Sequence, residues 1–545
     1  MSEHTAELSA PPPEPETRSG SKRGIVAVVA SVVAVVLVAG GGYAAWQFFS
    51  SGGPRPAEVL PDTTFALVTV DLNPSGGQKV EAIKTLRKFP SWTKRTGITP
   101  DSDVMKAIFD EALKDGPCKA LDYEKDIKPW IGHRAGLGGV VLGGKPAPVL
   151  ALQISDVDKA KTGFAALAKC ADPSDKEFGF TTTDDYVIAS DSTAHAQAIV
   201  AAGTKAPLAE NADFQKWTDE VGGPGIVNAY LSRTSPKILS TLDSGKGGLG
   251  GLTDGLVDPG GLGGLAGGAS AGGVAFTPGS ADKDEIANAF KDFKGAAAGL
   301  RFADGGIELA FAGGGAKAYD GKSVGRHVSA LPKDTAAVLA LAVPEKALDG
   351  LKSGGSSQEG LRSLTQMFTE GTGLELPDDL VTLLGSSVSV SLGGDAPAKL
   401  SDLSGPGDLP IGLLVHGDDA AIKAVVAKVE AKTGASLSDL PATLSSKDGE
   451  VALSTQSGYA QDLLGDGSLG DAENFKDVVT HASESQGIFY LSLDNGWTDA
   501  LRDAADGQDK DADEAAQNLA ALRAVGFSAW SQGDTAHGLL RVALK

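Results

Sequence analysis

A hydrophobic run spans residues 24–49 and contains no charged residue. At a rise of about 1.5 Å per residue, a helix of this length reaches roughly 39 Å, which exceeds a bilayer hydrocarbon core of about 30 Å. Lys22 and Arg23 precede the run, and Tyr43 and Trp46 lie near its far end. Basic residues on the cytoplasmic side and aromatic residues at the interface are typical of a transmembrane helix. We therefore expect a single-pass cell-membrane protein with a cytoplasmic N-terminus and an extracellular C-terminal part.

A cleaved signal peptide is the alternative interpretation of this run, because small residues near Ala44 offer a peptidase site. The apolar core of a signal peptide usually has about 7–15 residues, so the greater length favours an uncleaved anchor. Residues 1–23 contain a proline-rich stretch and few apolar positions, which predicts a disordered cytoplasmic tail. Residues 50–60 are expected to form a linker.

After the linker, the hydrophobic pattern switches between the periods of strands and of amphipathic helices. Residues 65–72 are apolar on both faces, which predicts a central strand, and residues 78–89 follow a helical period. A predicted hairpin over 135–154 is followed by a helix over 157–169. The whole pattern predicts an α+β fold, in which a mostly antiparallel sheet carries helices on one face.

The same order of segments occurs twice, which indicates a tandem duplication. LPDTT at residue 60 is echoed by LPKDT at residue 331, and PVLALQIS at residue 148 by PIGLLVHG at residue 410. GIVNAYLS at residue 225 corresponds to GIFYLSLD at residue 487, a separation of 262 positions.

We place one exported repeat at residues 61–329 and the other at residues 330–545. The first repeat contains an insertion at residues 245–273 with glycine at 14 of 29 positions. A flexible lid and an unselected flexible loop are both compatible with that composition, and the loop is favoured.

Several segments of the exported part resemble a known family. The most specific are Leu60-Pro61-Asp62, the turn over residues 71–77, and the segment 123–132 with Cys118 before it. The family consists of single-pass, membrane-anchored proteins of GC-rich Gram-positive bacteria and is known only as a domain of unknown function. The resemblance extends over essentially the whole exported part. It implies membrane location and export, but no activity and no site residue.

The charge balance narrows the classes of partner. The chain has 70 acidic and 48 basic residues, a formal net charge of −22. Such a charge repels nucleic acid and favours solubility, so we expect no nucleic-acid partner. The 72 glycines show no collagen period and are typical of a GC-rich bacterial genome.

Cys118 and Cys170 are the only cysteines, and both lie in the part predicted to be exported. Thiols commonly oxidise outside the cytoplasm, so we expect one disulfide. A reactive free-thiol pair is the alternative, but the sequence lacks the Cys-X-X-Cys spacing typical of it.

Soon after the predicted anchor, this acidic chain contains one segment rich in basic residues. It consists of Lys79, Lys84, Arg87, Lys88, Lys94 and Arg95. We expect this segment to contact an anionic surface, either lipid headgroups or a wall polymer. The alternative is a solvated helix face whose cations pair with acidic neighbours.

No motif in the sequence indicates catalysis. Gly321–Gly325 matches G-x-S-x-G and His327 lies close by, but this motif needs a strand before it and a helix after it. The seven histidines include no H-x-x-x-H pair, so a zinc site would require ligands from distant segments. We therefore expect no catalytic residue, no cofactor and no metal.

The sequence favours a non-catalytic cell-envelope binding or interaction module, with a wall polymer, lipid or envelope protein as partner. An extracytoplasmic hydrolase with a site between the repeats is the alternative. A structural or assembly factor that acts through the cytoplasmic tail is a third hypothesis.

Overall fold

The computed structural model describes residues 54–72, 118–171, 179–239, 291–303, 305–315, 321–344, 378–397, 403–434, 442–505 and 518–545, with short pieces between them. The predicted tail, the predicted anchor at 24–49 and the insertion at 245–273 lie outside the described residues. Among the helices that are described, none has both the length and the apolar character required to cross a bilayer.

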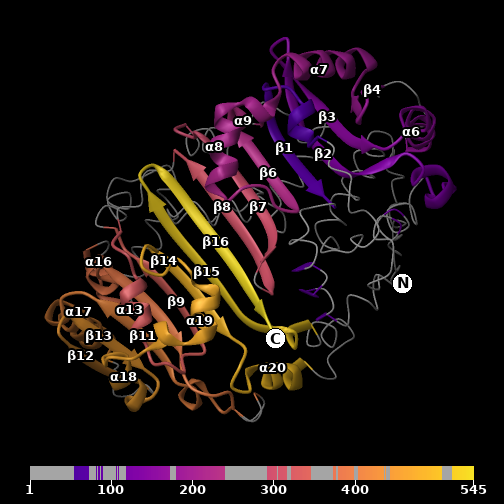
Figure 1. The fold of residues 1–545 in the computed structure, drawn as a ribbon. Coiled ribbons are helices and arrows are strands. Elements are labelled where there is room, and N and C mark those ends of the chain that lie inside the picture. The colour runs from indigo at the N-terminus through magenta and orange to yellow at the C-terminus, as the bar shows by residue number, and fades with distance from the viewer. Residues whose placement is uncertain are drawn as a thin grey trace, which may run out of the picture.

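The described strands form a single antiparallel sheet of sixteen strands, with helices packed on it (Figure 1). The first half contains β1 (Thr64–Asp71), β2 (Ile131–Leu142), β3 (Lys145–Ile154), β4 (Gly179–Thr182), β5 (Tyr186–Ser190), β6 (Val227–Ser232), β7 (Gly295–Ala303) and β8 (Gly306–Gly314). The second half contains β9 (Ala337–Ala342), β10 (Ser387–Leu392), β11 (Ile411–His416), β12 (Thr443–Lys447), β13 (Glu450–Ser454), β14 (Gly487–Ser492), β15 (Leu522–Gln532) and β16 (Thr535–Leu544). The predicted α+β class is therefore confirmed.

Both halves have the same strand order. From the outer edge inward, the first half runs β4-β5-β3-β2-β1-β6-β7-β8 and the second runs β12-β13-β11-β10-β9-β14-β15-β16. The innermost strands, β8 and β16, pair directly from Gly314 opposite Thr535 to Gly306 opposite Ala543. The sequence left open whether the two repeats form separate sheet domains or one fused sheet, and this pairing joins them into one sheet.

The strand pairing also corrects how the two halves align. Tyr230 of β6 lies opposite Leu67 of β1, and Tyr490 of β14 lies opposite Val338 of β9. Leu67 and Val338 are 271 positions apart, as are LPDTT and LPKDT. The Tyr-Leu-Ser sequences at 230 and 490 therefore correspond, a separation of 260 positions and not 262.

Helices cover both faces of the sheet rather than the single face that was expected. The helical segments of the first half are α2 (Pro56–Val59), η1 (Tyr123–Ile127), α6 (Val157–Ala171), α7 (Thr193–Lys205), η2 (Leu208–Glu210), α8 (Ala212–Glu220) and α9 (Ser235–Leu239). Those of the second half are α13 (Gly325–Ser329), α16 (Asp378–Leu384), η4 (Pro406–Asp408), α17 (Asp419–Thr433), α18 (Ser457–Leu463), η6 (Leu469–Asp471), α19 (Glu473–Val478) and α20 (Trp497–Ala505).

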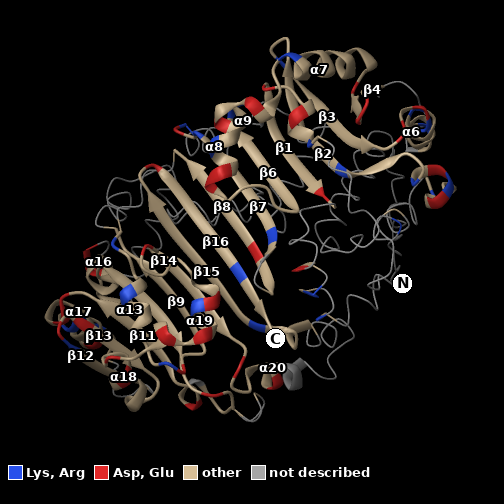
Figure 2. Ribbon diagram, in the orientation of Figure 1, with Lys and Arg blue, Asp and Glu red and all other residues tan. Residues whose placement is uncertain are grey.

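Alternate residues of one strand lie in different cores, which explains the two layers of helices. In β5, Tyr186 and Ile188 belong to the core that includes Ile199 of α7, whereas Val187 and Ala189 belong to the core that includes Phe164 of α6. A strand apolar on both faces requires cover on both faces. We call the face that carries α7, α8, α13 and α19 the front face. Charged residues lie mainly on helices, turns and strand ends (Figure 2).

Candidate functional site

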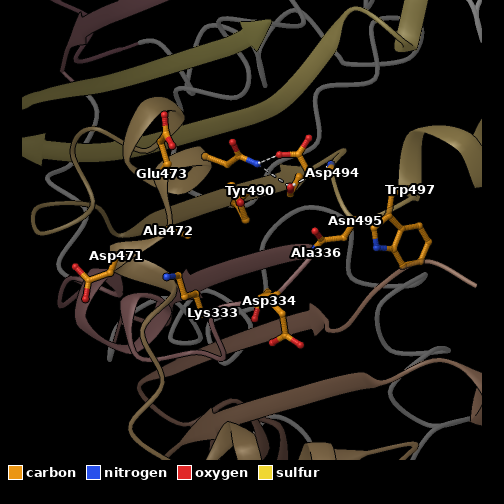
Figure 3. Close-up of a pocket in the computed structure, with 13 residues that line it drawn as sticks. Lys333, Asp334, Ala336, Asp471, Ala472, Glu473, Tyr490, Asp494, Asn495 and Trp497 are labelled. Atoms are coloured by element: carbon orange, nitrogen blue, oxygen red, sulfur yellow. Dashed lines mark hydrogen bonds between the residues drawn. The ribbon is translucent and has the colours of Figure 1, made fainter. Parts of the chain in front are cut away.

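A polar pocket of about 460 Å³ lies on the second half, where β9 begins and β14 ends (Figure 3). Four carboxylates line it, those of Asp334, Asp471, Glu473 and Asp494, together with a single cation, Lys333. The charged side chains of the lining have an excess of three negative charges, which favours a ligand group that carries positive charge. Two cations outside the lining offset part of it, since Lys476 pairs with Asp471 at 3.2 Å and Arg523 lies 3.9 Å from Glu473.

One wall of the pocket is a turn that both halves contain. The backbone N–H and the hydroxyl of Thr335 both donate to the carbonyl oxygen of Pro332, at 3.0 and 2.7 Å. Thr64 makes the same two bonds to Pro61, at 3.0 and 2.6 Å. The turn fixes the backbone on either side of Lys333 and Asp334, which reach the pocket from the segment before β9 (Figure 3).

The opposite wall orients a carboxylate with an amide. Asn474 donates through Nδ2 to Asp494 Oδ2 at 2.6 Å and to Ser492 Oγ at 3.1 Å, as the dashed lines in Figure 3 mark. Arg523 Nη1 in turn donates to Asn474 Oδ1 at 2.9 Å. This chain of bonds holds Asp494 in one position, so its second carboxylate oxygen has a fixed place in the pocket.

A left-handed residue shapes the rim. Asn495 has a φ of 55°, a conformation that asparagine tolerates better than most residues, and Gly496 follows with a φ of 85°. The turn brings Trp497 to the pocket, where its indole Nε1 donates to the carbonyl oxygen of Gly394 at 3.3 Å.

The lining residues suit recognition better than covalent chemistry. None of them is histidine or cysteine. The Thr335 hydroxyl donates to Pro332, and Ser492 accepts from Asn474. Burial raises the pKa of Tyr490, so this phenol stays protonated at neutral pH. The pocket can therefore offer carboxylates, amides and a phenol to a polar ligand.

The corresponding place in the first half has a different charge. Asp213, in the first turn of α8, occupies the position of Asn474 in α19. Its carboxylate pairs with Arg233, with 2.5 Å between Oδ2 and Nη2. Asp213 thus pairs with an arginine, whereas Asn474 at the corresponding position orients the carboxylate of Asp494.

A second cluster lies on the second half, where β11 ends and β13 begins. His327 of α13, His416 of β11 and Glu450 of β13 have donor atoms that all lie within 4.8 Å of one another. The two imidazole rings have centroids 3.5 Å apart, and His416 Nδ1 lies 3.2 Å from Ser387 Oγ. Burial lowers the pKa of His416 to about 4 and also lowers that of His327, so both rings are neutral at pH 7.

This is the kind of cluster that linear spacing does not show. His327 and His416 are 89 positions apart, and each is unremarkable in its own segment. The only available signal was the comparison of the two repeats, which reveals histidine and glutamate where the first copy has other residues. Ser323 of the G-x-S-x-G match accepts from Gly325 N at 3.1 Å and donates to Ala482 O at 3.4 Å.

The sequence predicted two sets of site residues, the cysteine pair and the basic segment. Cys118 and Cys170 lie at disulfide distance, with Cα atoms 5.1 Å apart. Of the basic segment, only Lys84 and Lys88 are described, and Lys79, Arg87, Lys94 and Arg95 lie outside the described residues. Lys84 pairs with Glu81 at 2.8 Å, and Glu81 also accepts from the backbone N–H of Gly305 at 3.1 Å.

Comparison with known proteins gives one match. No curated protein and no solved structure matches the chain. Residues 28–246 match the model of a family described as "Protein of unknown function (DUF3352)". The match begins within the predicted anchor and ends at the glycine-rich insertion, so it includes neither the pocket nor the histidine cluster. Residues 28–246 thus match a domain of unknown function, as the resemblance predicted, but the match stops at residue 246, whereas the resemblance was expected to extend over essentially the whole exported part.

Proposed function

We propose that this chain is a single-pass, membrane-anchored exported protein whose extracellular part is a non-catalytic envelope-binding module. The apolar run at residues 24–49 supports the anchor and the cytoplasmic N-terminus. The repeated strand order and the repeated Pro-to-Thr turn support a tandem duplication as the origin of the two halves.

The acidic pocket is the observation that carries the binding proposal. Its excess of carboxylates and its fixed Asp494 suit a polar group with positive charge, such as an amine of a wall polymer or a basic side chain of an envelope protein. The basic segment that starts at Lys79 is proposed to contact anionic lipid or polymer separately, because an acidic pocket repels such surfaces.

The pocket favours binding over the alternative of a hydrolase, because its serine and threonine hydroxyls are engaged and its lining has no histidine to act as base. The hydrolase hypothesis placed the catalytic site between the two repeats. There, β8 and β16 are joined by a ladder of backbone pairs.

Co-sedimentation of residues 50–545, without the proposed anchor, with purified cell wall and with membrane vesicles tests the pocket. The variant D471N/E473Q removes two exposed charges from the rim, with side chains 76% and 88% exposed. The control E124Q/D158N removes two charges from the first half, with side chains 48% and 94% exposed.

We expect saturable capture by one fraction that the rim variant weakens at least about tenfold, a difference of about 1.4 kcal/mol, and that the control retains. Equal capture of all three proteins, or none, would contradict a role for the pocket. Release of soluble wall fragments over time would instead support the hydrolase alternative.

The basic segment needs its own test. Vesicles with and without anionic lipid are compared for residues 50–545 of the wild type and of K84E/R87E/K88E, because the proposed anchor would insert into both kinds of vesicle. We expect binding only to anionic vesicles, and loss of that binding in the variant, because each cation near such a surface contributes up to about 1 kcal/mol. Equal binding to both kinds of vesicle would remove this part of the proposal.

A further inference from the structure

We propose that His327, His416 and Glu450 bind a zinc ion. The three side chains come from separate elements, α13, β11 and β13, and their donor atoms lie within 4.8 Å of one another. Ligand atoms about 2.1 Å from a tetrahedral zinc ion lie roughly 3.4 Å apart. The cluster is therefore close to a coordination sphere and needs only small side-chain rotations to complete it.

The contact between His416 and Glu450 places a histidine nitrogen and a carboxylate oxygen side by side without an aligned hydrogen bond. Nε2 of His416 lies 2.9 Å from Oε1 of Glu450, yet this nitrogen is buried and makes no aligned hydrogen bond. A buried nitrogen without a partner is costly. Two atoms that come this close without pointing at each other can both direct lone pairs at a third point, which is where an ion would lie.

The other ring nitrogen of His416 has the partner that a metal ligand usually has. Nδ1 lies 3.2 Å from Ser387 Oγ, and a bond from Nδ1–H to this oxygen leaves Nε2 with its lone pair. Such an outer bond fixes the tautomer and the orientation of a ligating histidine. Burial also keeps both imidazoles neutral, which is the form that coordinates a metal.

The first half shows that the fold does not require these residues. By the strand pairing, Gln153 and Tyr186 occupy the positions of His416 and Glu450. Gln153 Oε1 accepts from His133 N at 3.1 Å, and the Tyr186 hydroxyl donates to Pro54 O at 2.7 Å. Both side chains are satisfied by the protein alone, so this fold does not need His416 and Glu450 at these two positions.

The donor set selects zinc among the common ions. Two imidazole nitrogens and one carboxylate are ligands that zinc accepts, and three protein ligands leave a fourth position for water. Calcium and magnesium require sets of oxygen ligands. Copper(II) binds such sites tightly but prefers a square-planar arrangement, so it serves as a comparison ion.

Titration with zinc chloride against a chromogenic chelator tests the proposal. The full-length protein carries no polyhistidine tag and is first stripped with EDTA. We expect one zinc ion per chain, and binding more than about 100-fold weaker in H327Q and in E450Q. S387A removes only the outer partner and should weaken binding by about 10–100-fold. H195Q changes an exposed histidine and should bind as the wild type does.

Two further readouts separate loss of a ligand from loss of the fold. Zinc should raise the melting temperature of the wild type and of H195Q but not of E450Q, whose circular dichroism should be unchanged. The cobalt(II) form should show the visible absorption of a tetrahedral site, and H327Q should lose it. Failure of the wild type to bind zinc would overturn the proposal. So would wild-type affinity in H327Q and E450Q, which would mean that zinc binds elsewhere.

Discussion

His537 lies within β16, the strand at which the two halves meet. Its ring stacks parallel to that of Trp530, with centroids 5.1 Å apart, and Trp530 stacks on His481 at 4.0 Å. Its Nε2 lies 3.6 Å from a carboxylate oxygen of Glu220, which belongs to α8 of the first half. Burial lowers the pKa of His537 from 6.5, and nearby His481 lowers it further, against the opposing effect of Glu220 and Glu484.

This shift predicts a pH dependence of stability. Below about pH 6.5 the unfolded chain binds a proton at His537 that the folded chain resists, so the free energy of unfolding falls as the pH falls through this range. We expect H537Q to show a weaker dependence than the wild type between about pH 7.5 and 5, by at most about 1.4 kcal/mol per pH unit. Urea denaturation of the wild type and of H537Q at several pH values measures this pH dependence of the free energy of unfolding. Identical slopes would contradict the assignment, and H195Q is the control.

A single buried hydroxyl ties the start of the described chain to the sheet. Tyr186 donates to the carbonyl oxygen of Pro54, and its side chain is fully buried. We expect Y186F to lower the free energy of unfolding by about 1 kcal/mol, because the carbonyl loses its bond. Y230F is the matched control, since Tyr230 is also buried and burial likewise raises the pKa of its phenol. Equal effects of the two substitutions in urea denaturation would argue against the bond.

The disulfide illustrates an element-scale restraint. Cys118 precedes η1, and Cys170 lies near the end of α6. The bridge closes a loop with a sequence separation of 52, so we expect C118S/C170S to lower the free energy of unfolding by about 4 kcal/mol in the chain-entropy model. Urea denaturation with and without reductant measures the effect. The double variant should not respond to reductant, and a wild type that is equally insensitive would show that the bridge contributes little.

Element types were largely predictable from the sequence, whereas register was not. The hairpin predicted over 135–154 is observed as β2 and β3. However, the sequence comparison of the two repeats aligned Ala151 of β3 with Leu413 of β11. Ala151 and Leu414 are the residues that share the front-face cores, so the alignment is wrong by one position within the strand. Because both faces of these strands are apolar, hydrophobicity does not distinguish the two registers.

The helix that follows explains the error. Asp156 and Asp418 both begin the helices, and these two residues are 262 positions apart. Corresponding residues of the preceding strands, β3 and β11, are 263 positions apart. The second copy therefore has one residue fewer between strand and helix. An alignment that fits the helices must therefore misplace the strands. The candidate sites were missed for a similar reason, since the pocket and the histidine cluster depend on contacts between segments and not on local spacing.

At the scale of the whole molecule, the pairing of β8 with β16 predicts that the halves unfold together. Leu309 of β8 lies opposite Leu300 of β7 on one side and opposite Leu540 of β16 on the other. Proline here removes a backbone donor from a strand that is paired on both sides. We expect L309P to split one unfolding transition into two, or to lower its midpoint sharply. L309A keeps the backbone donor and should leave a single transition. Two separate unfolding transitions in the wild type would contradict the prediction that the halves unfold together.

The continuous sheet itself was not predictable, because β8 and β16 have the periodicity of ordinary hairpin strands. Nothing in either segment specifies that its free edge pairs with a strand more than 220 positions away. Only the acidic composition and the repeat were visible at this scale. The match to a family over residues 28–246 likewise covers β1 to β6 of the first half and not the joint.

The β8–β16 joint relates two equivalent strands as a two-fold axis relates the partners of an isologous dimer. A chain with only one half would present β8 as an open edge, and a second molecule could close it by the same ladder. The fused chain thus behaves as a homodimer made covalent. Its two halves do not share one sequence, so one can have Gln153 and Tyr186 where the other has His416 and Glu450.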